Sequence, residues 1–151
     1  VLQETYSVDG ETLTLKGGAS LTFLGPAEDI PADRINDRSL ITLFQTGSAS
    51  VLLMGDAEEP AEQSLLRHHP GLRCDILKVG HHGSDTSSSP AFLSALGAQT
   101  AIISCGTDND YGHPAEQTLT NLTLAGVRDI RMTAESGTVA LPLIAYKENA
   151  V

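Results

Sequence analysis

The stretch KVGHHGSDTSSSP (residues 78–90) sets the order of a strand, a polar loop and a helix, and it places two adjacent histidines in the loop. The preceding run, DILKV, is short and mostly apolar, which is typical of a buried strand. The Ser89-Pro90 pair matches the residue preferences for the cap and the first position of a helix. His81 and His82 therefore follow a strand end, where loops commonly carry functional side chains.

Strands and helices alternate on the C-terminal side of this pattern, whereas strands dominate its N-terminal side. Acidic residues open a helical segment over residues 56–69, and another helix runs from Pro114 to Gly126. A hairpin is predicted over residues 11–25, and two strands flank the Thr46-Gly47-Ser48 turn. The remaining predicted strands cover residues 101–104, 127–133 and 137–145. This order predicts an α/β domain in which helices pack on one face of a mixed sheet.

Composition limits the classes of function. The 151 residues, of which 40% are apolar and 19% charged, suffice for one compact domain with a core. A net charge of −10 with only nine Lys and Arg argues against a broad basic face for nucleic acid, but it allows a nuclease that holds one phosphate with metal ions. The apolar runs are too short to span a bilayer. Because the sequence begins at Val1 without a leader, we expect a processed chain or a piece of a longer one.

The two cysteines are expected to be free thiols. Cys74 and Cys105 each adjoin an apolar strand segment, and the sequence has no CxxC pair that would favour a metal site. A disulfide or a metal role remains the alternative.

Candidate functional residues follow or precede several of the predicted strands. Asp56 follows the apolar run VLLMG, and His81 and His82 follow DILKVG. His113 lies in NDYGHP after AIISCG, and Asn36 precedes SLITLF. If these loops share one edge of the sheet, Asp56 and the three histidines converge. Carboxylate and imidazole groups form a mixed ligand set suited to zinc, manganese or iron.

Each candidate also has a purely structural interpretation. Asp56 is placed like a helix cap, and His113, before a proline, is placed like a residue that leads into a helix. The histidine pair could lie in a solvated loop. The SDTSSS segment (residues 84–89) is typical of turns and caps, with phosphate binding by its hydroxyl groups as the alternative.

Four linked motifs resemble one family. In chain order they are NDRSL (residues 36–40), LLMGDAE, DILKVGHHGSDTSSS and AIISCGTDNDYGHP. Together they resemble the second half of a metallo-β-lactamase-fold hydrolase, in particular the hydrolase domain of ComEC-type proteins of competence and DNA uptake or their stand-alone relatives. The resemblance covers about residues 10 to 141. It implies that residues 1–151 form a single partial domain, the C-terminal half of a metallo-β-lactamase-like hydrolase domain.

The resemblance implies an αββα sandwich with its site at the upper edge of two sheets. Asp56 matches a carboxylate that bridges two metal ions, and His81 matches the last metal-binding histidine. His82, Asn36 and His113 match pocket positions that bind phosphate or assist proton transfer. With Asp56 they are the candidate catalytic residues. The complete domain is expected to hold two divalent ions, Zn²⁺ or Mn²⁺.

The sequence departs from the family pattern at two points. The HxHxDH motif that supplies most ligands is absent, since no histidine precedes His68, and Gly25 stands where some relatives carry a histidine. The chain therefore offers at most two ligands, Asp56 and His81, which is fewer than the three typical of a catalytic zinc. We expect the isolated chain to hold metal weakly or not at all, and to be inactive by itself.

The resemblance implies that the parent protein is an enzyme. The expected activity is a metal-dependent hydrolase, phosphodiesterase or nuclease-like, that acts through a metal-activated water. Two alternatives remain open. One is a hydrolase of small esters, lactones or thioesters on the same fold, and the other is an inactive fragment or degenerate domain that serves as a binding or structural module.

Partners and location follow from the same resemblance. The expected partners are a phosphodiester or small-molecule substrate, single-stranded DNA and the N-terminal half of the domain. Where that half would pack, we expect an exposed apolar sheet face through which the chain could dimerise. A ComEC-type membrane protein would place the domain outside the cytoplasm, and a stand-alone relative would be cytoplasmic.

Overall fold

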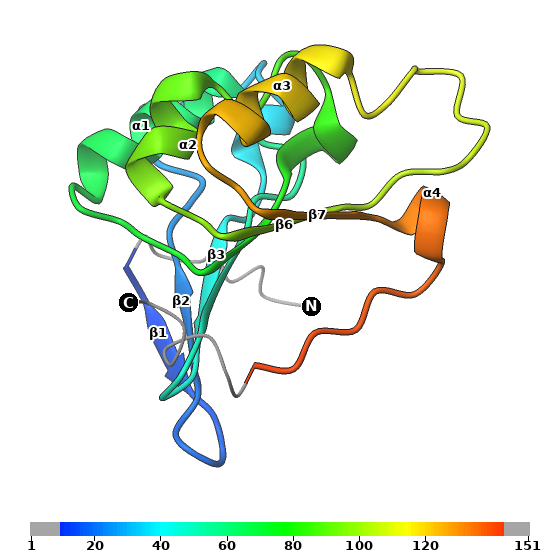
Figure 1. Ribbon diagram of the computed structural model, residues 1–151. Helices are drawn as coiled ribbons and strands as arrows, with labels where there is room; N and C mark the ends of the chain where they lie inside the picture. The colour runs from blue at the N-terminus through cyan, green and yellow to red at the C-terminus, as the bar shows by residue number, and fades with distance from the viewer. Residues whose placement is uncertain (1–9, 144–151) are drawn as a thin grey trace, which may run out of the picture.

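The computed structural model describes residues 10–143, which form a seven-stranded sheet with helices packed on it (Figure 1). The strands lie side by side in chain order, from β1 to β7. Their bounds are β1 Thr12–Thr14, β2 Ser20–Phe23, β3 Thr42–Gln45, β4 Ser50–Leu53, β5 Ile76–Lys78, β6 Thr100–Ile103 and β7 Asp129–Met132. The helices are η1 Asn36–Arg38, α1 Glu59–His68, η2 Gly80–Gly83, α2 Pro90–Leu96, α3 Glu116–Leu124 and α4 Thr133–Ser136.

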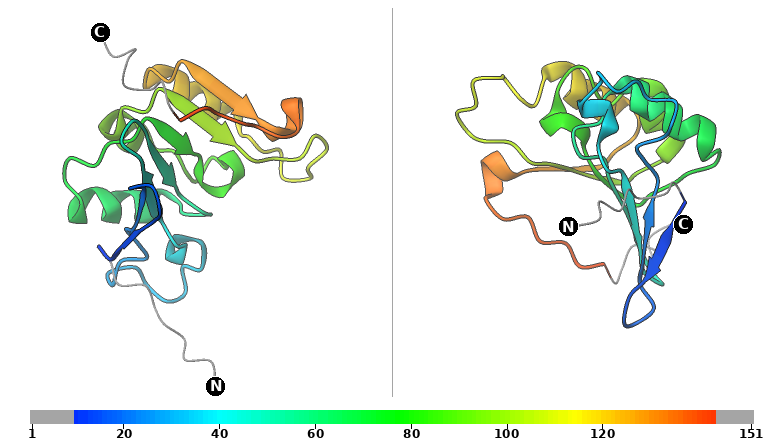
Figure 2. Two further views of the ribbon diagram at one scale, coloured as in Figure 1. Left: turned by 90° about the horizontal axis from the view of Figure 1, so that it is seen from below. Right: turned by 180° about the vertical axis from the view of Figure 1, so that it is seen from behind.

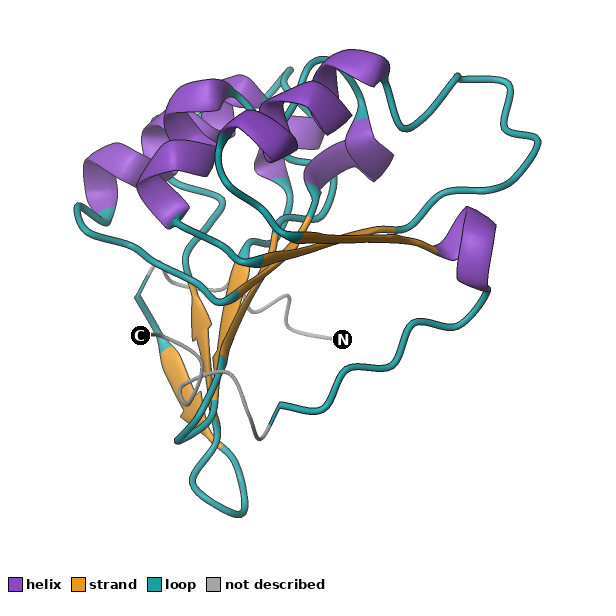
Figure 3. Cartoon of the chain, in the orientation of Figure 1, coloured by secondary structure: helices purple, strands orange, loops and turns teal. Residues whose placement is uncertain are grey.

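The sheet is antiparallel in its first half and parallel in its second. Strands β1 to β4 pair in antiparallel fashion, with short turns between β1 and β2 and between β3 and β4 and a longer connection that contains η1 between β2 and β3. Strands β4 to β7 pair in parallel. Parallel neighbours need a crossover, and α1, α2 and α3 supply the three crossovers on the same face of the sheet (Figure 3). The predicted mixed sheet with helices on one face is confirmed.

The sheet twists strongly from one edge to the other. In Figure 1 the strands β1 to β3 run nearly upright, whereas β6 and β7 lie nearly flat under the helices. The further views in Figure 2 show the same change of direction. A right-handed twist accumulates across neighbouring strands because of backbone sterics. The carboxyl ends of β4, β5 and β6 consequently stay together at one edge, while the first hairpin extends away from them.

The core lies between the sheet and the three crossover helices. One row of side chains crosses four strands in register, from Leu43 to Leu52, Leu77 and Ala101, and all of them are buried. The helices contribute further buried side chains: Ala61 and Leu65 from α1, Phe92, Leu93 and Leu96 from α2, and Leu122 from α3. Burying an aliphatic or aromatic side chain of this size contributes about 1.5–3 kcal/mol, so this layer holds the helices on the sheet.

The face of the sheet opposite the helices is also apolar. Side chains alternate along a strand, so Phe44, Val51 and Ile76, which pair across β3, β4 and β5, point away from the helix layer. Leu53 lies on the same face and is 38% exposed. The predicted exposed face is present only in part, because Ile76 is 1% exposed and Phe44 and Val51 are partly buried. Its use in dimerisation stays a prediction.

Two buried carboxylates accept backbone N–H groups at, or directly ahead of, the starts of two helices. Asp37 is 1% exposed and accepts hydrogen bonds from the backbone N–H groups of Glu58 (3.0 Å) and Ala61 (3.3 Å) at the start of α1. Glu62, also 1% exposed, accepts the N–H groups of Ser88 and Ser89 at the start of α2. Unpaired N–H groups at a helix start attract anions, so each acid joins two segments that are distant in sequence.

The caps differ from the predicted ones. Ser89 is the cap residue of α2 and Pro90 opens the helix, as predicted, but the Ser89 side chain makes no capping hydrogen bond. Glu62 instead accepts the backbone N–H groups of Ser88 and Ser89, directly ahead of the helix. Burial raises the pKa of Glu62, and the hydrogen bonds from Ser89 and Ser88 oppose this rise. Helix α1 begins at Glu59 with Glu58 at its cap position, so the interpretation of Asp56 as a helix cap is wrong.

The C-terminal part of the chain differs most from the prediction. The predicted strand over residues 127–133 is confirmed as β7, but the short helix α4 follows it directly. Residues 137–143 form no strand, and the rest of the predicted strand 137–145 lies outside the described residues. None of the helices between residues 10 and 143 is long and apolar enough to cross a bilayer.

Replacing Asp37 by alanine should destabilise the fold by about 2 kcal/mol, because two buried N–H groups at the start of α1 lose their acceptor. Urea denaturation followed by circular dichroism measures the free energy of unfolding. Asp33→Ala is the control, since Asp33 is exposed in the same loop. Equal stabilities for the two variants would show that Asp37 is not the cap on which α1 depends.

Candidate functional site

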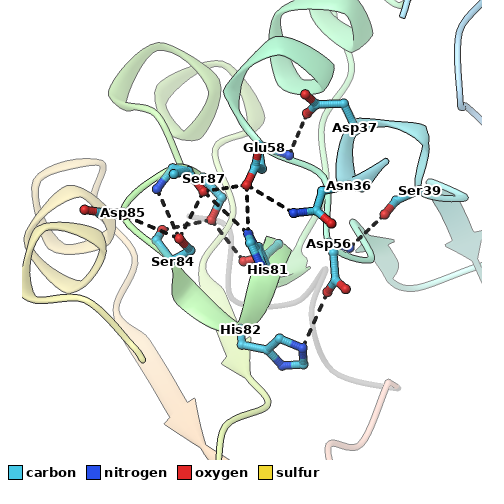
Figure 4. Close-up of polar contacts among 12 residues, drawn as sticks. Asn36, Asp37, Ser39, Asp56, Glu58, His81, His82, Ser84, Asp85 and Ser87 are labelled. Carbon is cyan, nitrogen blue, oxygen red and sulfur yellow. Dashed lines mark hydrogen bonds and ion pairs between the residues drawn. The ribbon is translucent and has the colours of Figure 1, made fainter. Parts of the chain in front are cut away.

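The candidate residues gather at the carboxyl edge of the three parallel strands β4, β5 and β6. Asp56 follows β4, His81 and His82 follow β5, and His113 lies in the loop after β6. The His82 Nε2 atom is 3.5 Å from Asp56 Oδ1 (Figure 4), and the ring centroids of His81 and His113 are 5.8 Å apart. The predicted convergence of these four side chains is therefore confirmed.

The histidine pair lies in a backbone conformation that is rare for residues with a side chain. His81 has φ 46° and His82 has φ 54°, both left-handed, and Gly83 follows at φ 83°. Each such non-glycine residue costs on the order of 1 kcal/mol and persists only where the surroundings hold it. Two backbone hydrogen bonds hold this turn, from the His81 N–H to the Gly55 carbonyl (3.0 Å) and from the Ser84 N–H to the His81 carbonyl (2.9 Å).

The turn at residues 80–83 packs directly against the turn at residues 55–58. A Cβ atom on Gly80 would lie 2.5 Å from the carbonyl oxygen of Ala57, so only glycine allows this approach. Gly55 is similarly confined, because a Cβ there would lie 2.9 Å from the Ser39 side chain, and its φ is 58°. These two glycines bring Asp56 within reach of the histidine pair.

His82 is fixed by two oxygen atoms. Its Nδ1 atom lies 2.7 Å from the carbonyl oxygen of Ser104, and its Nε2 atom faces Asp56. A carbonyl oxygen only accepts hydrogen bonds, so Nδ1 carries the proton in the neutral ring and Nε2 carries the lone pair. Both His82 (51% exposed) and Asp56 (50% exposed) remain open to a ligand.

His81 contacts a carboxylate that sequence reasoning missed. Its Nδ1 atom lies 3.0 Å from Glu58 Oε1, and the His81 side chain is 26% exposed. Burial would raise the pKa of Glu58, but hydrogen bonds from Thr86 and Asn36 and the neighbouring His81 outweigh it and leave this pKa below its ordinary value. The sequence contains Glu58 in the LLMGDAE motif, yet its role depends on a contact between two turns.

The NDRSL motif acts on the neighbouring turn and on α1 (Figure 4). Asn36 Nδ2 donates to Glu58 Oε1 (3.3 Å), and the Ser39 hydroxyl oxygen accepts the Asp56 N–H (2.9 Å). With the Asp37 cap, these contacts set the position of residues 55–58. Asn36 and His81 thus contact the same Glu58 oxygen atom, Oε1. A catalytic role for Asn36 stays a prediction.

His113 forms the other wall of the site. Asn109 accepts the His113 N–H (2.8 Å) and donates to its carbonyl oxygen, and the Tyr111 ring stacks on the His113 ring at 5.8 Å and 17°. The His113 Nδ1 atom is buried without a hydrogen-bond partner among residues 10–143. Helix α3 begins only at Glu116, so His113 lies ahead of the helix cap, Ala115.

A hollow of about 210 Å³ opens beside His113 and is lined by His82, Cys105, Gly106, Asn109, Tyr111 and His113.

The serine-rich segment after the histidines is a scaffold. Ser84, Ser87 and Ser88 are 4%, 3% and 1% exposed. The Ser87 hydroxyl donates to the carbonyl oxygens of Gly80 and Ser84, and Thr118 Oγ1 donates to the Ser84 carbonyl. The turn role is confirmed for this segment, and Ser89 occupies the cap position of α2 without a capping hydrogen bond from its side chain. Phosphate binding by these three hydroxyl groups is wrong, because they face the protein interior.

A cation and two thiols complete the surroundings. Burial lowers the pKa of Lys78, the charges of Asp56 and Cys105 oppose this shift, and Lys78 Nζ donates to the Val79 carbonyl (2.9 Å). Both cysteines are free, as predicted, and burial raises the pKa of Cys74 to about 12, which makes it a poor nucleophile.

A carboxylate and an imidazole from two turns are available to a metal ion. Asp56 and His81 are the predicted ligands. The Nδ1 atom of His81 contacts Glu58 and that of His82 contacts Ser104, so each ring has its Nε2 atom for a metal ion, although His82 Nε2 also lies 3.5 Å from Asp56 Oδ1. Within residues 10–143, no three His, Cys, Asp or Glu side chains form a group able to hold an ion. The donor types suit Zn²⁺ or Mn²⁺, but further ligands are needed for tight binding.

The chain is similar to segments of several competence proteins. It is 38% identical over 130 residues to the ComE operon protein 3 of Bacillus subtilis, covering 86% of this chain and 16% of that protein. It is 36% identical over 115 residues to the competence protein ComA of Neisseria gonorrhoeae, covering 76% of this chain and 16% of that protein. No protein-family profile matches the chain.

A third relative extends this relationship. The chain is 44% identical over 79 residues to recombination protein 2 of Haemophilus influenzae, covering 52% of this chain and 10% of that protein. In each comparison the matched segment is a small part of a much longer protein. The chain is therefore related to competence proteins through one segment of their length.

Proposed function

We propose that this chain contributes one half of the active site of a metal-dependent phosphodiesterase of the metallo-β-lactamase fold, with DNA as its substrate. The similarity to competence proteins is consistent with a role connected to DNA. The observation that carries the proposal is the placement of Asp56, His81 and His82 on two adjoining turns at the edge of parallel strands. Divalent ions at Asp56 and His81 would activate a water molecule and polarise the phosphoryl group.

The side chains of this chain would perform three tasks in that reaction. Asp56 is half exposed and faces His82 Nε2 with Oδ1, so its other carboxylate oxygen can receive a cation. His82 can hold a proton on Nε2 for the leaving group, because its Nδ1 atom is already bound to Ser104. His113 lies across from His81 and closes the site on the β6 side.

The hollow beside His82 favours a nucleic-acid substrate over a small aliphatic ester. Tyr111 is 83% exposed, and its ring lies nearly parallel to that of His113. Proteins hold the bases of single-stranded nucleic acids on such aromatic rings, largely independent of sequence. A base could lie on the Tyr111 ring while its phosphate reaches Asp56 and His82.

Substitution of the site residues tests the reaction. In the parent protein with Mn²⁺ or Zn²⁺, Asp56→Asn and His81→Gln should abolish hydrolysis of bis-p-nitrophenyl phosphate, because each removes a metal ligand. His82→Gln should lower kcat by roughly 10²-fold, the usual contribution of a proton donor. His68→Gln, on the exposed last turn of α1, is the control and should match the wild type.

The same assay separates the competing functions. Wild-type activity in the His81 variant would contradict the proposed ligand. Hydrolysis of an ester, lactone or thioester panel without hydrolysis of the phosphodiester would instead support the small-molecule hydrolase. Hydrolysis of neither class at saturating metal would support an inactive binding module.

Replacing Tyr111 tests the substrate class. Tyr111→Ala should raise KM for a single-stranded oligonucleotide about tenfold, because loss of one base stack costs roughly 1–3 kcal/mol. The value of KM for bis-p-nitrophenyl phosphate should change less, and Tyr111→Phe, which keeps the ring, should resemble the wild type for both substrates. An unchanged KM for the oligonucleotide in the alanine variant would rule out the Tyr111 ring as its platform.

A further inference from the structure

Glu58 lies at the centre of the contacts between the two turns (Figure 4). Its Oε1 atom has three polar neighbours: His81 Nδ1 at 3.0 Å, Thr86 Oγ1 at 2.9 Å and Asn36 Nδ2 at 3.3 Å. A carboxylate oxygen only accepts hydrogen bonds, so each of these neighbours donates to it. The Glu58 side chain is 21% exposed, and its three donors come from three separate segments of the chain.

This geometry determines which nitrogen of His81 carries the proton. Because Nδ1 donates to Glu58, the lone pair of the neutral ring is on Nε2. The Thr86 hydroxyl, 3.5 Å from the same Nδ1, already donates to Glu58 and does not compete. Within residues 10–143, the His81 Nε2 atom makes no hydrogen bond. His81 therefore presents an unshared lone pair from a ring whose other side is anchored.

Glu58 itself is held rigidly. Its backbone N–H donates to the buried Asp37 carboxylate at 3.0 Å, and the next N–H, of Glu59, donates to the Thr86 carbonyl at 2.9 Å. Residues 56–58 therefore move with the serine-rich segment and with η1, and a shift of Glu58 would break contacts on both sides. The side chain of the neighbouring Glu59 is exposed and bonds only within α1, to Gln63, so this carboxylate has no contact with the histidine turn.

We propose that Glu58 is a positioning residue: it fixes His81 as the Nδ1–H tautomer and orients the ring so that Nε2 binds a divalent cation. This inference rests on the proposed metal-dependent function. A carboxylate that accepts the second N–H of a ligand histidine orients the ring and increases its basicity, and its loss typically weakens metal binding 10–100-fold. With Oε1 engaged by three donors, Glu58 acts on the cation through His81.

The tautomer can be observed directly and without metal. Long-range ¹H–¹⁵N correlation spectra of the ¹⁵N-histidine-labelled chain, recorded at alkaline pH where the rings are neutral, distinguish Nδ1–H from Nε2–H. His81 is assigned by its absence in His81→Gln. We expect Nδ1–H in the wild type and a loss of this form in Glu58→Ala. Glu58→Gln, which keeps an acceptor oxygen, should retain part of it, and the matched control Glu59→Ala should retain all of it.

Metal affinity is the second readout. Titration of the parent protein with Zn²⁺ or Mn²⁺, followed by calorimetry, should show binding that is weakened 10–100-fold in Glu58→Ala and unchanged in Glu59→Ala. A wild-type His81 in the Nε2–H form would overturn the inference without any variant. Equal spectra and affinities for the two alanine variants would also overturn it while leaving the metal site intact.

The outcomes separate this inference from the proposed function. Suppose that wild-type His81 is the Nδ1–H form and that this form is lost in Glu58→Ala, but that no cation binds to the chain or to its parent protein. The effect of Glu58 on the His81 tautomer would then be supported, and the metal-dependent function would be contradicted. If Glu58→Ala fails to fold, which backbone amide spectra would reveal, Glu58→Gln and the wild-type spectrum still decide the question. A Glu58→Gln variant identical to the wild type in tautomer and affinity would show that the charge of Glu58 is dispensable.

Discussion

The candidate site depends on the absence of a side chain at residue 80. Gly80 lies against the carbonyl oxygen of Ala57 so closely that a Cβ would sit 2.5 Å from it. This contact lets the turn after β4 and the turn after β5 share the hydrogen bond between the His81 N–H and the Gly55 carbonyl. The polar contacts of Asp56 and Glu58 with the two histidines follow from that approach. The left-handed backbone of both histidines is then a consequence of a turn that is held from two sides.

Acidic side chains support this arrangement from within the fold. Asp37 and Glu62 are buried acids that accept N–H groups at the starts of α1 and α2, and each joins two distant segments. The net charge of −10 therefore does not describe only a solvated surface. Two of the acidic residues counted in it, Asp37 and Glu62, are buried and hold the backbone at the starts of α1 and α2. An isolated carboxylate would be costly in such positions, but helix N–H groups offset the loss of water.

The sequence was sufficient to predict the mixed sheet, the crossover helices and the convergence of Asp56, His81, His82 and His113. These depend on strand periodicity and on the rule that parallel strands end at one edge, both of which are local patterns. It was insufficient for Glu58, because its role arises from contacts with residues 22 to 28 positions away. The interpretation of Asp56 as a helix cap was wrong for a similar reason, because α1 begins at Glu59 and a distant residue, Asp37, accepts the N–H groups at its start.

The cap of α1 is supplied by Asp37 from another segment. Ser89 stands at the expected cap position of α2, but its side chain makes no capping hydrogen bond, and Glu62 holds the backbone ahead of the helix. Local preferences located the starts of these helices but not the atoms that satisfy them. The strand predicted for residues 137–143 failed because alternation of apolar residues does not provide a partner strand, and backbone groups need one.

Anomalous diffraction from crystals of the parent protein grown with Mn²⁺ tests the central claim most directly. The account predicts a manganese peak within bonding distance of an Asp56 oxygen and of His81 Nε2, with Glu58 still hydrogen-bonded to His81 Nδ1. A peak bound through His81 Nδ1, or bound at Glu58 without Asp56, would contradict it. So would a fully loaded crystal whose manganese lies away from both turns.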